Sequence, residues 1–216
     1  MKNLSTPNNS LVLSYLGLRK AIGIIGIALP FVLVFGKIIL SGPGIEVSIS
    51  SYYYTVMRDV FVGSLCAIGV FLVSYRGYEL VDDIAGKFAT IFAVGTAFFP
   101  TRPANASAHQ ITIGNFHIFF SVSLFLTLAF FALVLFRKTD PTKTPTIQKQ
   151  KRNIIYTVCG FGILACMVLA LSLKLLPSDS LVFNFSPLFW LESSAIILFG
   201  ISWLVKGEAI LTDVVR

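Results

Sequence analysis

Six apolar segments, separated by shorter polar stretches, run along the chain. A helix that crosses the hydrocarbon core of a bilayer needs about 20 mostly apolar residues, within a range of about 17–25. The pattern predicts six transmembrane helices, at residues 21–40, 55–75, 84–100, 113–136, 154–176 and 185–205. The expected fold is an all-α polytopic transmembrane bundle that forms a single domain over residues 1–216.

The composition supports an integral membrane protein. Hydrophobic residues make up 56% of the chain and charged residues 12%, whereas soluble domains carry about 25% charged residues. The three cysteines lie inside apolar segments, so they predict small buried hydrophobes and no disulfide framework. No nucleotide-binding, protease, kinase or zinc-finger motif is present in the sequence. Membrane lipids are the expected partners, nucleic acid is not, and self-association into a homo-oligomer is left open.

The distribution of Lys and Arg predicts the orientation of the spans. Short cytoplasmic loops retain basic residues, and exported loops are depleted of them. The side that holds both termini carries most of the basic residues: Lys2, Arg19, Lys20, Arg76, Lys87, Arg137, Lys138, Lys143, Lys149, Lys151, Arg152, Lys206 and Arg216. The other side carries Lys37, Arg58, Arg102 and Lys174. Both termini are therefore expected in the cytoplasm.

One hydrophilic linker, RKTDPTKTPTIQKQKR at residues 137–152, divides the spans into two groups of three. We interpret it as a basic cytoplasmic topology determinant that lies on the lipid surface. The alternative is a binding site for anionic lipid or for a partner.

Ionisable residues within or beside the spans identify a candidate site. Such residues are costly in hydrocarbon and often mark pathways or binding sites. Most of them fall toward the predicted outer side, where the stretch SISSYYYTVMRD at residues 48–59 adds hydroxyl groups. The candidate ligand-binding cluster consists of Arg58, Asp59, His117, Glu192, Tyr53 and His109. If the spans form a bundle, these groups line one cavity that opens to the outside.

Each member of the cluster also has a structural explanation. Residues 52–54 and Trp190 are typical of an aromatic belt at the membrane interface. Arg58 suits a lipid phosphate, and Asp59 suits the positive end of a helix dipole. His117 is typical of a hydrogen-bonded contact between helices.

Glu192 is the strongest candidate, because an isolated carboxylate in hydrocarbon costs several kcal/mol and must be paired, protonated or hydrated. We expect its side chain to point into the bundle and to face Arg58 or His117. A structural salt bridge to Arg58 is the alternative to a functional role.

The two histidines and two carboxylates of the cluster are ligand types that suit zinc or manganese. They come from distant segments, and no His-x-x-x-His or His-Glu-x-x-His spacing joins them. Alkaline ceramidases and adiponectin receptors use three histidines, and this chain has two. We therefore predict no metal and no cofactor.

Three strings, SISSYYYTVMRDVFVG, FAVGTAFFPTRP and FWLESSAIILFGISWLVKG, are similar to those of bacterial six-helix inner-membrane proteins of unknown function. The resemblance covers most of the chain. It implies a small helical bundle in the inner membrane and supplies no site residues.

The leading functional hypothesis is a binding or sensing protein that holds a lipid headgroup or small amphiphile in an outward-facing polar cavity. The first alternative is a membrane-embedded lipid-modifying or metal-dependent hydrolase that uses Asp59, His117 and Glu192. The second alternative is a small transporter or a structural membrane subunit. The transporter is disfavoured because the middle and inner parts of the spans hold few ionisable groups.

Overall fold

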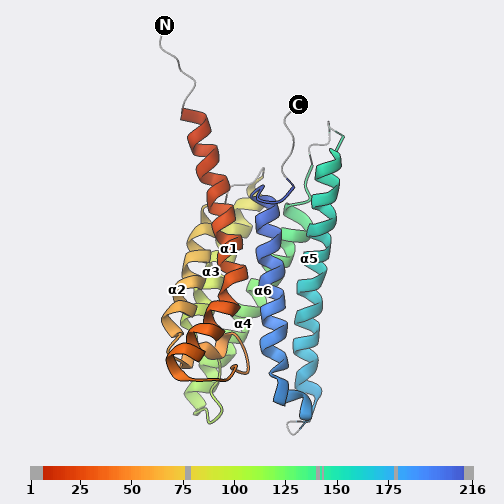
Figure 1. Cartoon of the computed structure of the whole chain (residues 1–216). Helices are drawn as coiled ribbons and strands as arrows, with labels where there is room; N and C mark the ends of the chain where they lie inside the picture. The colour runs from red at the N-terminus through yellow and green to blue at the C-terminus, as the bar shows by residue number, and fades with distance from the viewer. Residues whose placement is uncertain (1–6, 76–78, 140–141, 143, 178–179, 212–216) are drawn as a thin grey trace.

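The computed structural model describes residues 7–75, 79–139, 142, 144–177 and 180–211, and these residues are mostly helical and contain no strand (Figure 1). The long helices are α1 (Pro7–Ser41), α2 (Arg58–Val73), α3 (Leu80–Phe98), α4 (Ala108–Phe130), α5 (Ile147–Ser172) and α6 (Pro187–Lys206). The short elements are the 3₁₀ turns η1 (Ser50–Tyr54), η3 (Leu173–Leu175) and η4 (Leu181–Phe185), together with the π-helical turn η2 (Phe131–Leu135). The prediction of an all-α bundle is confirmed.

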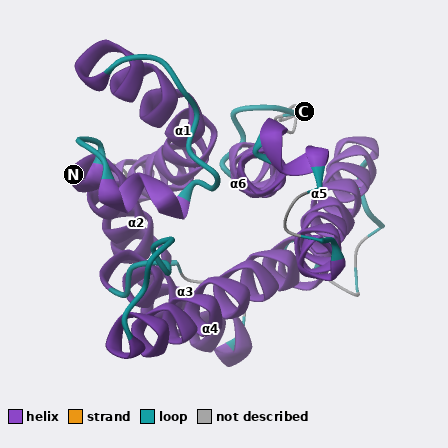
Figure 2. Cartoon of the chain, turned by 90° about the horizontal axis from the view of Figure 1, so that it is seen from below, coloured by secondary structure: helices purple, strands orange, loops and turns teal. Residues whose placement is uncertain are grey.

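The six long helices are arranged in a ring. Each helix packs against the helices before and after it in the chain, and α1 closes the ring against α6 (Figure 2). The start of α1 and the end of α6 lie at one end of the bundle, whereas η1 and η4 lie at the other (Figure 1). We call the second end the η1 end. A ring leaves space between helices that do not touch directly, and the candidate site occupies such a space.

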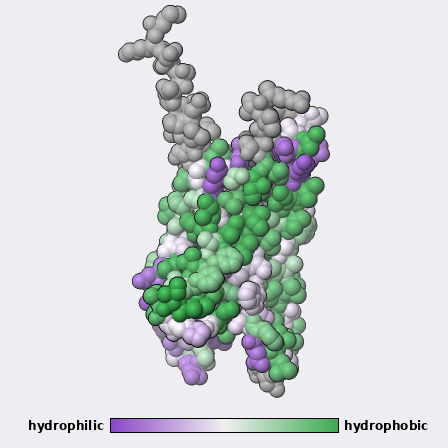
Figure 3. All heavy atoms as spheres, in the orientation of Figure 1, coloured by the Kyte–Doolittle hydropathy of each residue, from purple (hydrophilic) through white to green (hydrophobic). Residues whose placement is uncertain are grey.

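Four of the described helices are long and apolar enough to cross a membrane: α1, from Tyr15 onward, α4 continued through η2, α5 and α6. Helices α2 and α3 do not meet these requirements of length and apolar composition, each for a different reason. Helix α2 has 16 residues, about 24 Å of helix, and α3 carries Asp82, Asp83 and Lys87. Apolar side chains cover the middle of the visible outer face, and polar residues gather toward its ends (Figure 3).

Several helices begin earlier than predicted. Helix α1 begins at Pro7 and α5 at Ile147, whereas the apolar pattern placed these starts at residues 21 and 154. The last part of the linker predicted at residues 137–152 is therefore helical. Thr146 caps α5 by accepting a hydrogen bond from the backbone N–H of Lys149. Hydropathy marks only the apolar part of a helix, so it misses polar turns that extend beyond it.

The end of the bundle opposite η1 is filled by large aromatic side chains. Tyr75, Phe131, Phe136 and Trp203 are all buried, and the ring of Trp203 lies 5.4 Å from Tyr75 and 5.2 Å from Phe136, centroid to centroid. Edge-to-face pairs of this kind are favourable. Close packing at this end leaves the larger free volume at the η1 end.

Lys138 joins the start of α3 to the segment after η2. Its ammonium donates to Asp82 (2.9 Å), which is fully buried, and to Glu79 (3.0 Å), which is exposed. The hydrogen bond from Lys138 to Asp82 raises the pKa of the lysine above its ordinary value. Because the folded-state pKa is raised, this stabilisation is complete below the ordinary lysine pKa and is lost as the pH rises through the raised value.

We therefore expect Lys138→Met to destabilise the fold by about 1–3 kcal/mol, because it leaves the buried Asp82 carboxylate without its cation. The adjacent Arg137→Met is the matched control, since Arg137 is exposed and, within the described part of the chain, its side chain donates to the carbonyl of Leu133 in η2. Thermal unfolding in one detergent compares the two variants. Equal melting temperatures for them would contradict the role given to the Lys138–Asp82 pair.

Candidate functional site

Two adjoining cavities lie beside η1. The small cavity is enclosed by α1, α2, α3, α4 and α6, and the large cavity lies between α4, α5 and α6. The small cavity has a volume of about 50 Å³ and the large cavity about 570 Å³. Both are lined by the same group of residues where they meet: Ser50, His117, Ser121, Phe125 and Glu192. This shared group contains most of the polar side chains of the two cavities.

The large cavity continues from the shared group between apolar walls. Val122 and Phe125 of α4, Met167 and Ala170 of α5, and Leu191 of α6 form part of them. The combined space is therefore amphipathic, with polar groups near η1 and a longer apolar part. A cavity of this size is within the range that holds small ligands.

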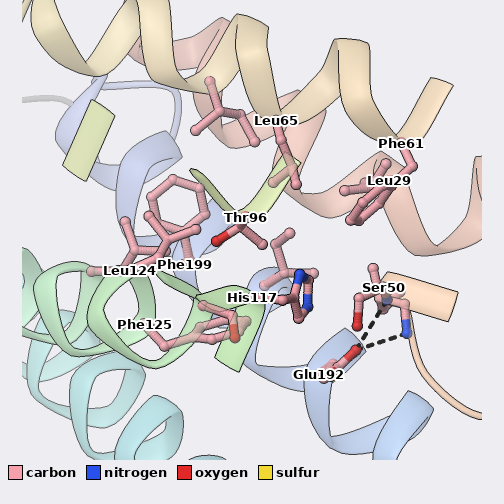
Figure 4. A pocket seen from close by; sticks show the side chains of 15 residues that line it. Leu29, Ser50, Phe61, Leu65, Thr96, His117, Leu124, Phe125, Glu192 and Phe199 are labelled. Carbon is pink, nitrogen blue, oxygen red and sulfur yellow. Dashed lines mark hydrogen bonds between the residues drawn. The ribbon is translucent and has the colours of Figure 1, made fainter. Parts of the chain in front are cut away.

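Glu192 reaches the shared group from the second turn of α6. Helix α6 begins after Ser186, which adopts the left-handed conformation (φ 47°), and Pro187 occupies its first turn. The Oε2 atom of Glu192 accepts hydrogen bonds from the backbone N–H groups of Ile49 (2.7 Å) and Ser50 (3.4 Å) (Figure 4). These groups begin η1 and have no partner within that turn, so the carboxylate caps η1 and fastens it to α6.

His117 enters the same space from α4 and is 4% exposed. Its Nδ1 lies 2.6 Å from the carbonyl oxygen of Phe99, at the C-terminal end of α3. A carbonyl oxygen can only accept, so Nδ1 carries the proton and, in the neutral ring, Nε2 is an acceptor. The interhelical hydrogen bond expected for His117 is therefore present, and it assigns the acceptor lone pair of the neutral ring to Nε2.

Of the two partners expected for Glu192, the structure places His117 beside it, and the salt bridge to Arg58, given above as the structural alternative, is not formed. No ion pair among the described residues joins Arg58 to Glu192; Arg58 instead lies over the ring of its neighbour Tyr53, with 4.4 Å from Cζ to the centroid, and donates to the Tyr53 hydroxyl (2.7 Å). The local contact within five residues competes successfully for Arg58. The carboxylate of Glu192 instead accepts hydrogen bonds from backbone N–H groups, and the pattern of charged residues in a sequence does not predict such partners. Its predicted inward orientation, sharing a cavity with His117, agrees with the structure.

The other predicted cluster members lie outside the cavities. Asp59 and His109 are exposed, and neither they nor Tyr53 are among the residues that line the two cavities. The six-residue cluster therefore reduces to His117 and Glu192. Among the described residues, no three His, Cys, Asp or Glu side chains come close enough to share a metal ion.

Tyr54 and Trp190 are 50% and 55% exposed, as residues of an aromatic belt would be, whereas Tyr52 is fully buried against Phe189 and cannot belong to one. Consecutive side chains of a 3₁₀ turn point about 120° apart, so three neighbouring tyrosines cannot all face the interface. Ser121 also lines both cavities, and its role was not predictable, because a serine within an apolar span gives no separate signal.

Comparison of the chain with protein-family models, with curated proteins and with solved structures gave no significant match.

Proposed function

We propose that this protein binds a small amphiphile or lipid in the two cavities, with the polar head at Glu192 and His117 and the chain between α4, α5 and α6. The observation that carries the proposal is the 570 Å³ cavity, which is polar at one edge and apolar along its walls. An apolar cavity of that size favours an apolar occupant over water. The polar edge gives such an occupant a fixed orientation.

We further propose that all six long helices cross the membrane, with both termini in the cytoplasm. Two observations support this topology. The start of α1 and the end of α6 lie at the same end of the bundle (Figure 1). Arg19 and Lys206 also meet at that end, where Arg19 donates to the Lys206 carbonyl (3.3 Å). Basic residues are retained on the cytoplasmic side, so the cavities open toward the outer side. The resemblance to bacterial inner-membrane proteins suggests the inner membrane.

The topology is tested by placing single cysteines at positions 45 and 105, at the η1 end, and at positions 79 and 145, at the opposite end. A membrane-impermeant maleimide added to intact cells is expected to label the first two positions and to spare the last two. Lysed cells, in which all four positions are reachable, serve as the control. Labelling of 79 and 145 in intact cells would reverse the proposed orientation.

Binding is tested by filling the large cavity. We expect Ala170→Trp to remove the copurifying amphiphile, because the indole occupies the volume beside Met167 and Leu191. The matched control is Val168→Trp on the same helix, since Val168 is 66% exposed on the outer face. Native mass spectrometry of protein purified from membranes measures the bound small molecules. Equal amphiphile content in the wild type and both variants would refute the binding function.

A further inference from the structure

Three polar side chains that line the cavities, Ser121, Thr96 and His117, have already used their hydrogen-bond donors. The hydroxyl of Ser121 donates to the carbonyl of Ile118 (3.2 Å), and that of Thr96 donates to Phe92 (2.8 Å). The Nδ1–H of His117 donates to Phe99. Each donor is consumed by a backbone carbonyl, either of the residue's own helix or of the end of α3.

The atoms with which these three side chains and Glu192 still face the space are therefore acceptors. Glu192 uses Oε2 to hold η1, and its Oε1 accepts no hydrogen bond from the described residues. The Nε2 of His117 and the hydroxyl oxygens of Ser121 and Thr96 keep lone pairs. Figure 4 shows Glu192, His117 and Thr96 around the same space, close to η1.

The described residues that line the two cavities include an acidic side chain, that of Glu192, and no Lys or Arg. Arg58, the cation predicted to bind a headgroup phosphate, is held by Tyr53 outside the cavities. A phosphate or carboxylate head would thus meet a carboxylate and several lone pairs without a compensating cation, at a high desolvation cost.

We infer that the head of the bound amphiphile is a hydrogen-bond donor, of the primary amine class, and that the site excludes phosphate and carboxylate heads. This inference rests on the proposed binding function and specifies its ligand. A primary ammonium group brings three donors and one positive charge, which match the acceptors of His117 and Ser121 and the charge of Glu192. A quaternary ammonium keeps the charge but brings no N–H donor, so it satisfies only part of the site.

The test uses four amphiphiles with the same dodecyl chain: dodecylamine, dodecyltrimethylammonium, dodecanol and dodecyl phosphate. The wild-type protein is placed in phosphatidylcholine nanodiscs, which contain no primary amine, and binding is measured by native mass spectrometry. Dodecylamine is expected to bind about tenfold or more tightly than the quaternary and phosphate analogues, because charge-assisted hydrogen bonds are the strongest of the contacts available. This comparison needs no variant and so does not depend on the folding of one.

Glu192→Gln then tests the role of the charge. The variant keeps a side-chain oxygen for η1, and its affinity for dodecylamine should fall toward its affinity for dodecanol. Glu79→Gln, an exposed carboxylate at the opposite end, is the matched control and should keep the preference for dodecylamine.

The outcomes separate this inference from the proposed function. Saturable binding of dodecyl phosphate that equals or exceeds that of dodecylamine, and that Ala170→Trp abolishes, would overturn the amine assignment and leave amphiphile binding intact. Equal affinity for the primary and quaternary ammonium would likewise overturn the donor requirement. Binding of none of the four, or binding that Ala170→Trp leaves unchanged, would overturn both.

Discussion

Replacing Gly200 with alanine is expected to lower the free energy of unfolding by about 1–3 kcal/mol, the usual cost of forcing an added methyl group into a packed interior. A Cβ at this position of α6 would lie 2.7 Å from the carbonyl oxygen of Gly23 and 3.0 Å from the backbone nitrogen of Ile27, both on α1. Backbone atoms cannot rotate aside as a side chain does. The two helices would have to separate, and the ring would loosen where it closes.

The matched control is Gly63→Ala on α2, where an added Cβ meets no atom within 4 Å. That change should be neutral or slightly stabilising, because alanine has the higher helix propensity. Thermal unfolding of both variants and the wild type in the same detergent gives the comparison. A Gly200→Ala protein that melts with the wild type would contradict the close approach of α1 and α6.

Glu192→Leu is expected to produce the other large effect, a destabilisation of about 2–3 kcal/mol that is concentrated in η1. The backbone N–H groups of Ile49 and Ser50, residues that are 6% and 8% exposed, would lose their acceptor. A buried donor without a partner costs about 1–3 kcal/mol. Hydrogen exchange should accelerate over residues 49–54 and change little at the aromatic end of the bundle.

Glu192→Gln is the matched variant for this experiment, since its amide oxygen can still accept from Ile49. It should recover much of the lost protection of η1 while lacking the negative charge. Exchange that accelerates uniformly over the whole chain in Glu192→Leu, or not at all over residues 49–54, would contradict the capping role of the carboxylate.

A double-mutant cycle separates Glu192 from Arg58. Their partners differ, because Glu192 holds η1 and Arg58 lies on Tyr53. The effects of Arg58→Met and Glu192→Leu on thermal unfolding should therefore add within about 0.5 kcal/mol. A coupling free energy clearly above that value would show that Arg58 and Glu192 interact directly and would contradict the separate partners described here.

The helical segments were predictable from the order of residues because the interactions that decide them are local. In a bilayer each helix must satisfy its own backbone hydrogen bonds, so a run of apolar residues is sufficient to specify a spanning helix. The same reasoning fails at helix ends. The polar turn after Thr146 is helical because the threonine caps it, and hydropathy does not record such a cap.

The candidate site was predictable only in part. The burial of Glu192 and the hydrogen bond of His117 follow from the cost of leaving a polar group in hydrocarbon, which depends on one residue and its depth. The partners of these groups depend on distant backbone atoms. Glu192 meets an N–H group 143 residues away, and no pattern of side chains records where a free backbone donor will lie.

The sequence by itself determined that this is an all-α, strongly apolar chain with helices long enough to cross a membrane, and that Glu192 belongs in the interior. These properties arise from residue types and their spacing, so they need no knowledge of packing. Only the tertiary structure decided that Arg58 and Asp59 stay outside, that Tyr52 is buried, and that Glu192, His117 and Ser121 share one space. Those outcomes depend on how η1 folds back onto α6 and how the ring closes, which are contacts between residues far apart in the chain.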